Sequence, residues 1–345
     1  MDKRPLVSFC FTTYKRPDIL IETIRSIMVQ SIGDWEVVVS DNDPDQSGRK
    51  IESAFDDERI RYFPNGENLG MKKSFNKSLD RSRGSFIVMI ADDDPVYPDM
   101  LETLFKLERQ YPGYGMYMGG GDLYCMTVSL AELNGLRIGT NTFLNNEHDE
   151  GHIWQLSPEA FINRIFYYDL LSNYLWSCCL VRREVLLEMG GVPDYGTPFL
   201  GDYAYMTIVA AHSGVVVINK ALGRQTIHPE NFGRAQNDQL KLAVTAFRDY
   251  VSNSFKKKDL PASVYPAMDR FLGIWVGRHL AFLFHYYRKN NLPLDPLKKA
   301  EREIFAIPLV KKYYIKYRLR RDYPALHDAI VRIKKRFTPP RAGHG

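Results

Sequence analysis

Residues 86–94 read FIVMIADDD, an apolar run that leads directly into three aspartates. A short apolar run rich in β-branched residues predicts a buried strand, so the aspartates are expected at its carboxyl end. Three adjacent carboxylates repel one another, and a divalent cation would neutralise them. Mg²⁺ and Mn²⁺ prefer such oxygen ligands, usually together with substrate phosphates. A solvated acidic turn is the alternative interpretation, but the position directly after a buried strand favours a metal site.

Two earlier apolar runs also end in polar residues. Leu6–Phe11 leads into TTYKR at residues 12–16, and Trp35–Val39 leads into SDND at residues 40–43. The pattern further predicts helices at 17–28, 49–55 and 71–81, and a strand at 59–63. Strands that alternate with helices at this spacing predict a parallel α/β sheet, in which ligands bind beyond the carboxyl ends of the strands. All three polar clusters are therefore expected at one edge of the sheet.

The rest of the chain is less regular and then becomes helical. The three glycines at 119–121 and the stretch 134–151 are expected to be loops. The expected elements are strands at 175–182 and 215–218, and helices at 184–189, 203–211, 238–255, 267–287 and 297–321. A compositional break near residues 231–236 predicts a catalytic domain of residues 1–235 and a basic helical C-terminal region of residues 236–345.

Composition excludes several classes of protein. The 345 residues are 45% hydrophobic and 25% charged, as in soluble globular proteins and unlike collagen-like or disordered chains. The four cysteines form no CxxC pair, and their spacing does not indicate a disulfide-bonded protein. This favours a reducing, cytoplasmic compartment. The first apolar run is too short for a signal peptide, and no window of about 18 uncharged apolar residues predicts a membrane-spanning helix.

Charge is distributed unevenly along the chain. Residues 236–345 hold 23 Lys and Arg against 9 Asp and Glu, whereas the first 235 residues hold 23 against 32. Basic residues alternate with tyrosines between 311 and 321, and an apolar stripe follows at helical spacing between 326 and 337. A basic amphipathic helix with aromatic residues favours an anionic membrane surface. A helix packed on the catalytic domain is the alternative, and nucleic acid is not favoured because no known motif for it occurs.

Taken together and in order, five segments resemble the family 2 glycosyltransferases. The segments are 7–17, 35–43, 68–76, 90–94 with 98–99, and 201–203 with 228–229. The resemblance covers roughly residues 5–235. It implies an α/β fold of the GT-A kind, with a Rossmann-like, mixed but mostly parallel sheet flanked by helices, followed here by a C-terminal helical extension.

The resemblance also assigns roles to single residues. Thr12, Tyr14 and Arg16 would line the nucleotide pocket, and Asp41 or Asp43 would contact the base or ribose. Asp93 and Asp94 would hold Mn²⁺ or Mg²⁺ and the diphosphate, with Asp92 close by. His228 would be a further ligand of the metal or diphosphate, with Arg224 nearby. Asp202 would be the catalytic base, and Trp176 would lie on the acceptor side.

Several of these residues have an ordinary structural alternative. Asp202 is also suited to cap the following helix, His228 to lie in a plain loop, and Trp176 to pack in the core. Lys72 and Lys73 could contact phosphate, although solvated helix lysines are commoner. The sequence departs from the family where Thr12 replaces a frequent proline, Ala91 a frequent aspartate and Gly201 a frequent acidic residue.

The implied function is the inverting transfer of one sugar from a nucleoside-diphosphate sugar to a hydroxyl of a glycan or lipid-linked acceptor. The QxxRW motif and membrane helices of processive synthases are absent from the sequence, which favours single transfer. The resemblance suggests synthesis of an O-antigen or capsule unit, in the cytoplasm or on the inner face of the plasma membrane. A sugar nucleotidyltransferase and an inactive glycan- or membrane-binding scaffold are the alternatives. The glycine-rich opening typical of nucleotidyltransferases is missing.

Overall fold

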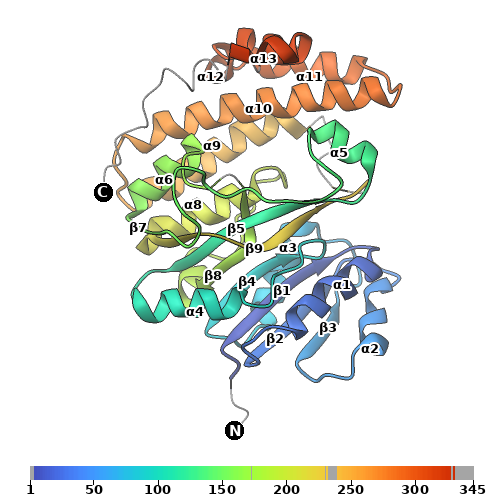
Figure 1. The fold of residues 1–345 in the computed structure, drawn as a ribbon, viewed down its shortest axis with the longest axis vertical. Helices are drawn as coiled ribbons and strands as arrows, with labels where there is room; N and C mark the ends of the chain where they lie inside the picture. Colours follow the sequence, from blue (N-terminus) through green and yellow to red (C-terminus); the bar gives the residue numbers. More distant parts are fainter. Residues whose placement is uncertain (1–3, 172, 230, 232–238, 328, 331–345) are drawn as a thin grey trace.

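The computed structural model describes residues 4–171, 173–229, 231, 239–327 and 329–330. In this part of the chain nine strands form one sheet, in the order β3-β2-β1-β4-β8-β5-β9-β7, with β6 paired to β5. Helices cover both faces of the sheet, and further helices form a layer at one end of the molecule (Figure 1). The predicted α/β architecture, with a mixed and largely parallel sheet flanked by helices, is confirmed.

The first half of the sheet is parallel. It contains β1 (Val7–Thr13), β2 (Trp35–Asp41), β3 (Ile60–Pro64) and β4 (Phe86–Ala91). Their helices are α1 (Pro17–Met28), η1 (Ser47–Arg49), α2 (Lys50–Ala54), α3 (Met71–Arg81) and α4 (Met100–Gln110). Since β1 pairs in parallel with both β2 and β4, the polar residues that follow these strands meet at one edge.

Alternating residues of the central strands enter two separate cores. Phe9 and Phe11 of β1 pack with the apolar faces of α1 and α4, whereas Cys10 packs with Phe75 and Leu79 of α3. This is the expected result of the two-residue period of a strand buried on both faces. The helices of the two faces thereby hold the carboxyl ends of the parallel strands in register.

The second half of the sheet is mixed. It contains β5 (Met116–Cys125), β6 (Gly139–Asn141), β7 (Ile153–Leu156), β8 (Tyr174–Arg182) and β9 (Val215–Ile227). The helices between and after these strands are α5 (Val128–Asn134), α6 (Pro158–Tyr167), α7 (Arg183–Glu188) and α8 (Gly201–Ser213). β8 runs antiparallel to β4 and β5, and β9 runs parallel to β5.

The expectation of a loop at residues 119–121 is wrong, because these glycines lie within β5. A Cβ added to Gly119 would come within 2.6 Å of the Leu222 side chain, and one added to Gly121 within 2.8 Å of the Leu175 side chain. The glycines therefore mark a close approach of neighbouring strands, not a turn. The predicted loop at 134–151 contains the short strand β6, and β7 lies just after it.

The described part of the C-terminal region is helical, as predicted. It contains α9 (Leu240–Lys257), α10 (Val264–Lys289), α11 (Asp295–Phe305), α12 (Pro308–Lys311) and α13 (Tyr314–Asp322). The single helix expected at 297–321 is wrong, because Pro308 begins a new helix and has no backbone N–H to continue the old one. Buried residues of α9 and α10 belong to the same hydrophobic cluster as those of α6 and α8. The boundary at residue 235 stays a prediction.

Two further sequence expectations concern the surface and the membrane. In the apolar stripe at 326–337, Ile333 and Phe337 lie outside the described residues. No described helix has both the length and the apolar character that crossing a bilayer requires. All four cysteines are buried, and none of them forms a disulfide.

Candidate active site

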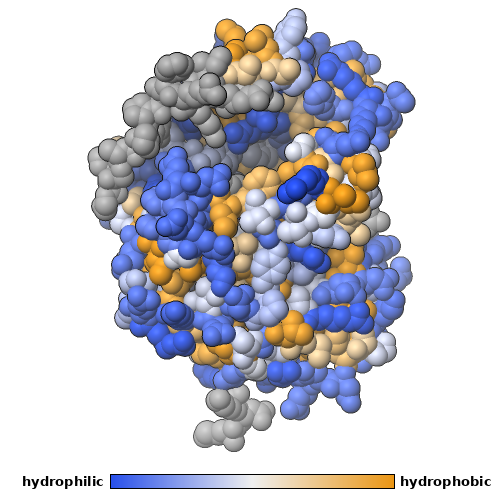
Figure 2. Space-filling view, in the orientation of Figure 1, coloured by the Kyte–Doolittle hydropathy of each residue, from blue (hydrophilic) through white to orange (hydrophobic). Residues whose placement is uncertain are grey.

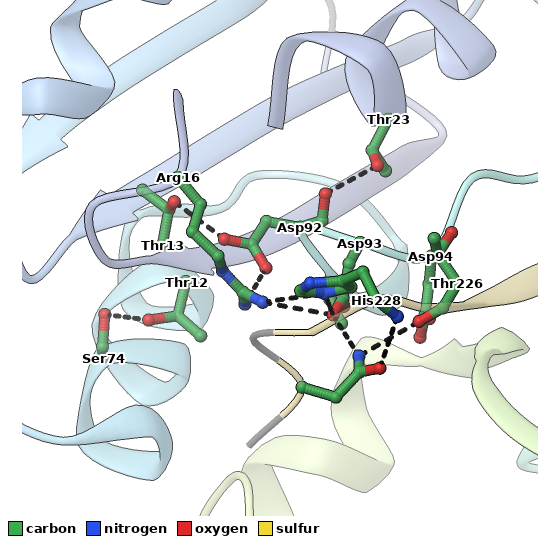
Figure 3. A network of polar contacts seen from close by, with 12 residues as sticks. Thr12, Thr13, Arg16, Thr23, Ser74, Asp92, Asp93, Asp94, Thr226 and His228 are labelled. Carbon is green, nitrogen blue, oxygen red and sulfur yellow. Dashed lines mark hydrogen bonds and ion pairs between the residues drawn. The ribbon is translucent and has the colours of Figure 1, made fainter. Parts of the chain in front are cut away.

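The polar residues that follow β1 and β4 contact one another directly (Figure 3). Thr13 Oγ1 donates a hydrogen bond of 2.9 Å to Asp92 Oδ2, and Thr12 Oγ1 donates one of 2.7 Å to Ser74 Oγ on α3. Thr23 Oγ1 on α1 donates to the backbone carbonyl of Asp92 at 2.7 Å. The acidic cluster is therefore anchored to the strand and helix beside it, as the sequence predicted for this edge.

Arg16 is the cation of the cluster. Its guanidinium forms an ion pair with Asp92, and its Nη1 lies 3.2 Å from Asp93 Oδ2. Lys15 has a φ of 58°, and this left-handed turn leads directly into Arg16 at the start of α1. Burial acts to lower the pKa of Arg16, but the two carboxylates outweigh burial and hold the pKa above its usual value.

Strand β9 brings His228 to the same cluster from a distant part of the chain. Gly223 of β9 forms a β-bridge with Val96, just beyond the aspartates, and the strand ends at Ile227. His228 Nε2 then lies 3.0 Å from Asp93 Oδ2 and 3.4 Å from Arg16 Nη1. His228 is 2% exposed, so it is not a plain loop histidine. Its ring supports Asp93, and direct ligation of a metal stays a prediction.

Asn231 also belongs to the cluster, and sequence reasoning missed it. Its Nδ2 donates to Asp93 Oδ2 at 3.3 Å, and its Oδ1 accepts from the His228 backbone N–H at 2.7 Å. An asparagine three residues after a histidine and proline is a typical turn residue and carries no local signal of binding. Only the long-range packing of β9 reveals its position.

Asp93 and Asp94 differ sharply in environment. Burial acts to raise the pKa of Asp93, but His228 and Arg16 outweigh burial and hold the pKa below its usual value. Asp94 accepts a hydrogen bond of 2.9 Å from Ser177 Oγ on β8, and no described Lys or Arg side chain pairs with it. Burial and the adjacent charge of Asp93 raise the pKa of Asp94 well above its usual value. Among the three aspartates, Asp94 is thus the one whose carboxylate forms no ion pair with a described Lys or Arg side chain.

The donor set at this edge suits a divalent cation that completes its coordination on a substrate. The described residues contain no group of three or more His, Cys, Asp or Glu side chains that could hold a metal by themselves. Mg²⁺ and Mn²⁺ sites commonly use one or two carboxylates together with phosphate oxygens and water. Asp94, with Asp93 beside it, supplies such carboxylates.

The turn after β2 is built by its own aspartates. Asp41 accepts hydrogen bonds from the backbone N–H groups of Asp43 and Gly48, and from the Tyr62 hydroxyl at 2.7 Å. Asp43 accepts from the backbone N–H groups of Asp45 and Ser47. Both carboxylates shape the turn, and Asp43 Oδ1 also lies 4.0 Å from Lys15 Nζ. Contact of either carboxylate with a base or ribose stays a prediction.

Tyr14 and Trp176 have opposite environments. Tyr14 is 43% exposed beside the turn after β1, which leaves its ring accessible. Trp176 is 6% exposed, and its ring packs edge-to-face against Phe75 and Tyr205 at centroid distances of 4.9 and 5.7 Å. Trp176 therefore packs in the core, as the alternative interpretation predicted, and its ring is not exposed for stacking on a sugar.

Asp202 lies in the first turn of α8. The helix begins at Gly201, after Leu200 at a left-handed φ of 62°, so Asp202 does not hold the capping position. Burial raises the pKa of Asp202, and the backbone N–H of Tyr203 and the charge of Lys72 oppose the increase. Asp202 is partly buried, and a carboxylate with a raised pKa accepts a proton more readily than an ordinary one.

Lys72 is not the solvated helix lysine that the sequence favoured. Its side chain is buried at the start of α3, with Nζ 3.4 Å from the centroid of the Tyr195 ring. Lys73, by contrast, is exposed. Arg224, expected near the diphosphate, lies on β9 with its guanidinium 4.5 Å from the Tyr124 ring centroid.

Comparisons with known proteins identify relatives of this chain. The chain is 28% identical over 138 residues to the putative colanic acid biosynthesis glycosyl transferase WcaA of Escherichia coli, covering 38% of this chain and 49% of WcaA. It is 30% identical over 118 residues to the GalNAc(5)-diNAcBac-PP-undecaprenol beta-1,3-glucosyltransferase of Campylobacter jejuni, covering 33% of this chain and 38% of that enzyme. The chain spans half or less of the length of these relatives.

Solved structures share the fold over nearly the whole chain. S. aureus TarS in complex with UDP-GlcNAc superimposes with a TM-score of 0.54 at 16% identity, over 90% of this chain and 91% of that one. The mannosyltransferase PcManGT from Pyrobaculum calidifontis, in complex with GDP-Man and Mn²⁺, gives 0.51 at 15% identity, over 94% and 88%. At these identities the likeness establishes the fold alone, which is the predicted GT-A fold.

The family itself follows from the sequence profile. The profile described as Glycosyl transferase family 2 matches residues 8–190, which include β1 from Ser8 onward, β2 to β8, the acidic cluster and α1 to α7, but not α8 or β9. The chain therefore belongs to glycosyl transferase family 2.

Proposed function

We propose that this protein transfers one sugar, with inversion, from a nucleoside-diphosphate sugar to a hydroxyl of a glycan or lipid-linked acceptor. The observation that carries the proposal is Asp94, a buried carboxylate without a basic partner among the described residues, at the carboxyl ends of the strands. The solved neighbours with this fold are complexes with UDP-GlcNAc and with GDP-Man, which supports a nucleotide-sugar as donor.

The nucleotide is expected at the turn after β1. Thr12, Tyr14 and Arg16 line this turn, and the guanidinium of Arg16 is 25% exposed. The side chain therefore remains accessible to a phosphate while it pairs with Asp92. Arginine suits this task because its planar group binds phosphate oxygens in pairs. Asp92 is expected to hold Arg16 in place, and Asp43 to contact the base or ribose.

Mn²⁺ or Mg²⁺ would be held by Asp94, with Asp93 beside it, and completed by the diphosphate. A cation bound there would stabilise the charge that develops on the departing diphosphate. His228 and Asn231 hold Asp93 Oδ2 from one side, and Ser177 holds Asp94 from β8. These contacts fix the two carboxylates before any ligand binds, which lowers the cost of organising the site.

Asp202 would accept the proton of the acceptor hydroxyl. A carboxylate whose pKa is raised by burial binds that proton more readily than an exposed one. Attack of the hydroxyl from the face opposite the diphosphate breaks the bond between the sugar and the diphosphate in one displacement. The anomeric centre would therefore be inverted.

Hydrolysis of nucleotide-sugars tests this proposal without knowledge of the acceptor, since water can replace the hydroxyl. We would screen UDP-, GDP-, CDP- and dTDP-sugars with Mn²⁺ and follow the released sugar by NMR. The expected product is the anomer opposite to that of the donor. Asp202→Asn should reduce the rate by about 10²–10⁴-fold, the range of general base catalysis.

The matched control is Asp194→Asn, which changes an exposed carboxylate that also lies near Lys72. We expect this variant to keep the wild-type rate. Retention of configuration, or an active Asp202→Asn variant, would contradict the proposed mechanism. Metal-dependent binding of nucleotide without any turnover would indicate a strict acceptor requirement, and no binding at all would favour the inactive scaffold.

We further propose that the C-terminal helices face an anionic membrane that carries the acceptor. Ile315, Tyr323 and Leu326 are 82%, 64% and 53% exposed around α13. Figure 2 displays hydrophobic residues at this end of the molecule beside hydrophilic ones. Lys311 and Lys312 are exposed on the same segment. Exposed apolar residues next to basic ones are typical of interfacial segments. The name of the C. jejuni relative, which contains PP-undecaprenol, supports a lipid-linked acceptor.

Sedimentation with vesicles tests the membrane proposal. We expect the full chain to bind vesicles that contain phosphatidylglycerol and not vesicles of pure phosphatidylcholine. Ile315→Glu should weaken binding, because it places a charge in the interface, whereas Leu187→Glu should not. Leu187 is a 53% exposed leucine on α7, far from α13 in the sequence. Equal binding to both kinds of vesicle, or none, would contradict an electrostatic membrane site.

A further inference from the structure

Lys72 is the charged group that the proposed chemistry leaves unexplained. It is the second residue of α3 and 5% exposed, and its Nζ has no hydrogen-bond partner among the described residues. An ammonium group can donate three hydrogen bonds, and burying it without acceptors has a substantial free-energy cost. Its neighbour Lys73 avoids that cost by facing solvent. We therefore expect the buried Lys72 ammonium to have a function that offsets this cost in stability.

Two contacts define that place. Lys72 Nζ lies over the Tyr195 ring at 3.4 Å from the centroid, a cation–π contact. The Tyr195 hydroxyl donates a hydrogen bond of 2.7 Å to the carbonyl of Phe199, which holds the ring near the start of α8. A Cβ added to Gly201 would lie 3.4 Å from Lys72 Cε. The end of the lysine therefore lies near both the ring and the residue that precedes Asp202.

The surrounding charges make Asp202 a natural counterion for Lys72. Asp194 and Asp202 are the carboxylates that favour its charged form, and neither forms an ion pair with it within 4.0 Å. The other titratable groups that Asp202 affects are Tyr168, just after α6, Tyr195, in the segment before α8, and Tyr203 of α8. Around these three tyrosines lie Tyr174 of β8, Tyr250 of α9, and Arg270 and Arg278 of α10. Lys72 is the lysine or arginine that opposes the effect of burial on Asp202.

We propose that Lys72 is a positioning residue for the base: its buried ammonium, held on the Tyr195 ring, keeps the Asp202 carboxylate ionised in the first turn of α8. The proposal rests on the proposed function, because it requires Asp202 to act as the base. In a site shielded from water a nearby cation favours the charged carboxylate strongly. Since Nζ is fully covered, Lys72 acts through Asp202 and does not touch the substrate.

The dependence of the rate on pH tests the proposal. We would measure kcat/KM for hydrolysis of the nucleotide-sugar that the wild type turns over, from about pH 5 to 9, for Lys72→Met, Lys72→Arg and the control Lys73→Met. Lys72→Met should move the acid limb upward by about half to one pH unit, because Asp202 then needs a higher pH to ionise. The donor KM should stay the same, and the rate should recover at high pH.

The controls separate charge from packing. Lys72→Arg keeps the charge and should keep the limb near its wild-type position, while Lys73→Met should match the wild type throughout. An acid limb that stays in place in Lys72→Met, with a rate reduced equally at every pH, would overturn the proposal. If Asp202→Asn were fully active, the base assignment would fail and this proposal with it. If Asp202→Asn were inactive and the limb unmoved, only the role of Lys72 would fail.

A second measurement does not depend on activity. Urea unfolding of Lys72→Met, Asp202→Asn and the double variant at pH 7 forms a double-mutant cycle, which isolates the interaction between two residues. We expect the two changes to be non-additive, with Asp202→Asn costing less stability once Lys72 is gone. Additive effects would show that the ammonium and the carboxylate do not interact, and would overturn the proposal.

Discussion

Three adjacent aspartates in one sequence motif occupy three different environments. Asp92 pairs with Arg16, and Asp93 is held by Arg16 and His228, whereas Asp94 accepts from the hydroxyl of Ser177 and forms no ion pair with a described Lys or Arg side chain. The first two carboxylates thus have a basic partner inside the protein. The proposed function depends on a bound cation as the partner of Asp94.

At the same scale, Lys72 should make the stability of the protein depend on alkaline pH. Burial lowers the pKa of Lys72 from 10.5 to about 8. Between those values the unfolded chain binds more protons than the folded one, so the free energy of unfolding should rise as the pH rises through this window. Lys72→Met should remove this rise and stabilise the protein at pH 7 by up to ~3 kcal/mol, since each pKa unit corresponds to about 1.4 kcal/mol.

Urea unfolding of both proteins at pH 7, 8, 9 and 10 provides the measurement. Lys73→Met serves as the control and should follow the wild type. Parallel curves for the wild type and Lys72→Met would contradict a destabilised ammonium in the folded state. A more stable but less active Lys72→Met variant would be a trade of stability for function at this site.

Elements with a continuous local signal were predictable, and those that depend on distant contacts were not. β1, β2 and β4 are apolar runs buried on both faces, so their sequences alone identify them. β5 was missed because its glycines resemble a loop, although they are required where Leu222 and Leu175 approach. Pro308 divides the helix predicted at 297–321, because a proline has no backbone N–H to continue the preceding helix.

The same division applies to the candidate site. The polar ends of the strands predicted that Arg16 and the aspartates would meet, because parallel strands end at one edge. Ser177 and Asn231 were missed, since their partners lie 83 and 138 residues away in the chain. The sequence around Trp176 fits a core residue as well as a residue that stacks on a sugar. The packing of its ring against Phe75, which is distant in the sequence, distinguishes these two roles.

A pair of glycine variants tests the tight packing of β5 against β9. A Cβ at Gly119 would meet the Leu222 side chain at 2.6 Å and the Lys220 carbonyl at 2.7 Å, whereas at Gly120 the nearest atom would be 3.6 Å away. Gly119→Ala should therefore lower the free energy of unfolding by about 1–3 kcal/mol, the usual cost of overpacking. Gly120→Ala should change it by less than about 1 kcal/mol. Equal effects in urea unfolding would contradict the close approach.

Across the whole molecule, the C-terminal helices complete the core beside Asp202, the proposed base. Phe271 of α10 packs against Tyr203, the residue after Asp202, with ring centroids 4.7 Å apart, and against Phe166 of α6 at 5.0 Å. α13 in turn packs on α10, where a Cβ at Gly277 would lie 3.5 Å from Tyr317 Cβ, and one at Gly273 within 2.1 Å of the ring of Tyr313, the residue before α13. The GT-A sheet and the helical layer therefore depend on each other around α8 (Figure 1).

Truncation tests this dependence and the predicted boundary at residue 235. A chain of residues 1–235 would expose the apolar faces of α6 and α8 that α9 and α10 cover. We expect it to aggregate or to unfold without a cooperative transition, whereas the full chain should unfold in one step. Circular dichroism during urea unfolding would report the difference. A soluble fragment with its own sharp transition would contradict a shared core.

The central claim is that Asp94 serves a cation-dependent transfer from a nucleotide-sugar, and one measurement tests it most directly. Hydrolysis of UDP-GlcNAc, GDP-Man and the other nucleotide-sugars would be compared in Mn²⁺ and in EDTA for the wild type, Asp94→Asn and the control Asp45→Asn, whose carboxylate is 86% exposed. We predict that one donor is hydrolysed with Mn²⁺ by the wild type and the control, and that EDTA or Asp94→Asn reduces the rate at least about 10²-fold. Equal turnover with EDTA, or by Asp94→Asn, would contradict the account.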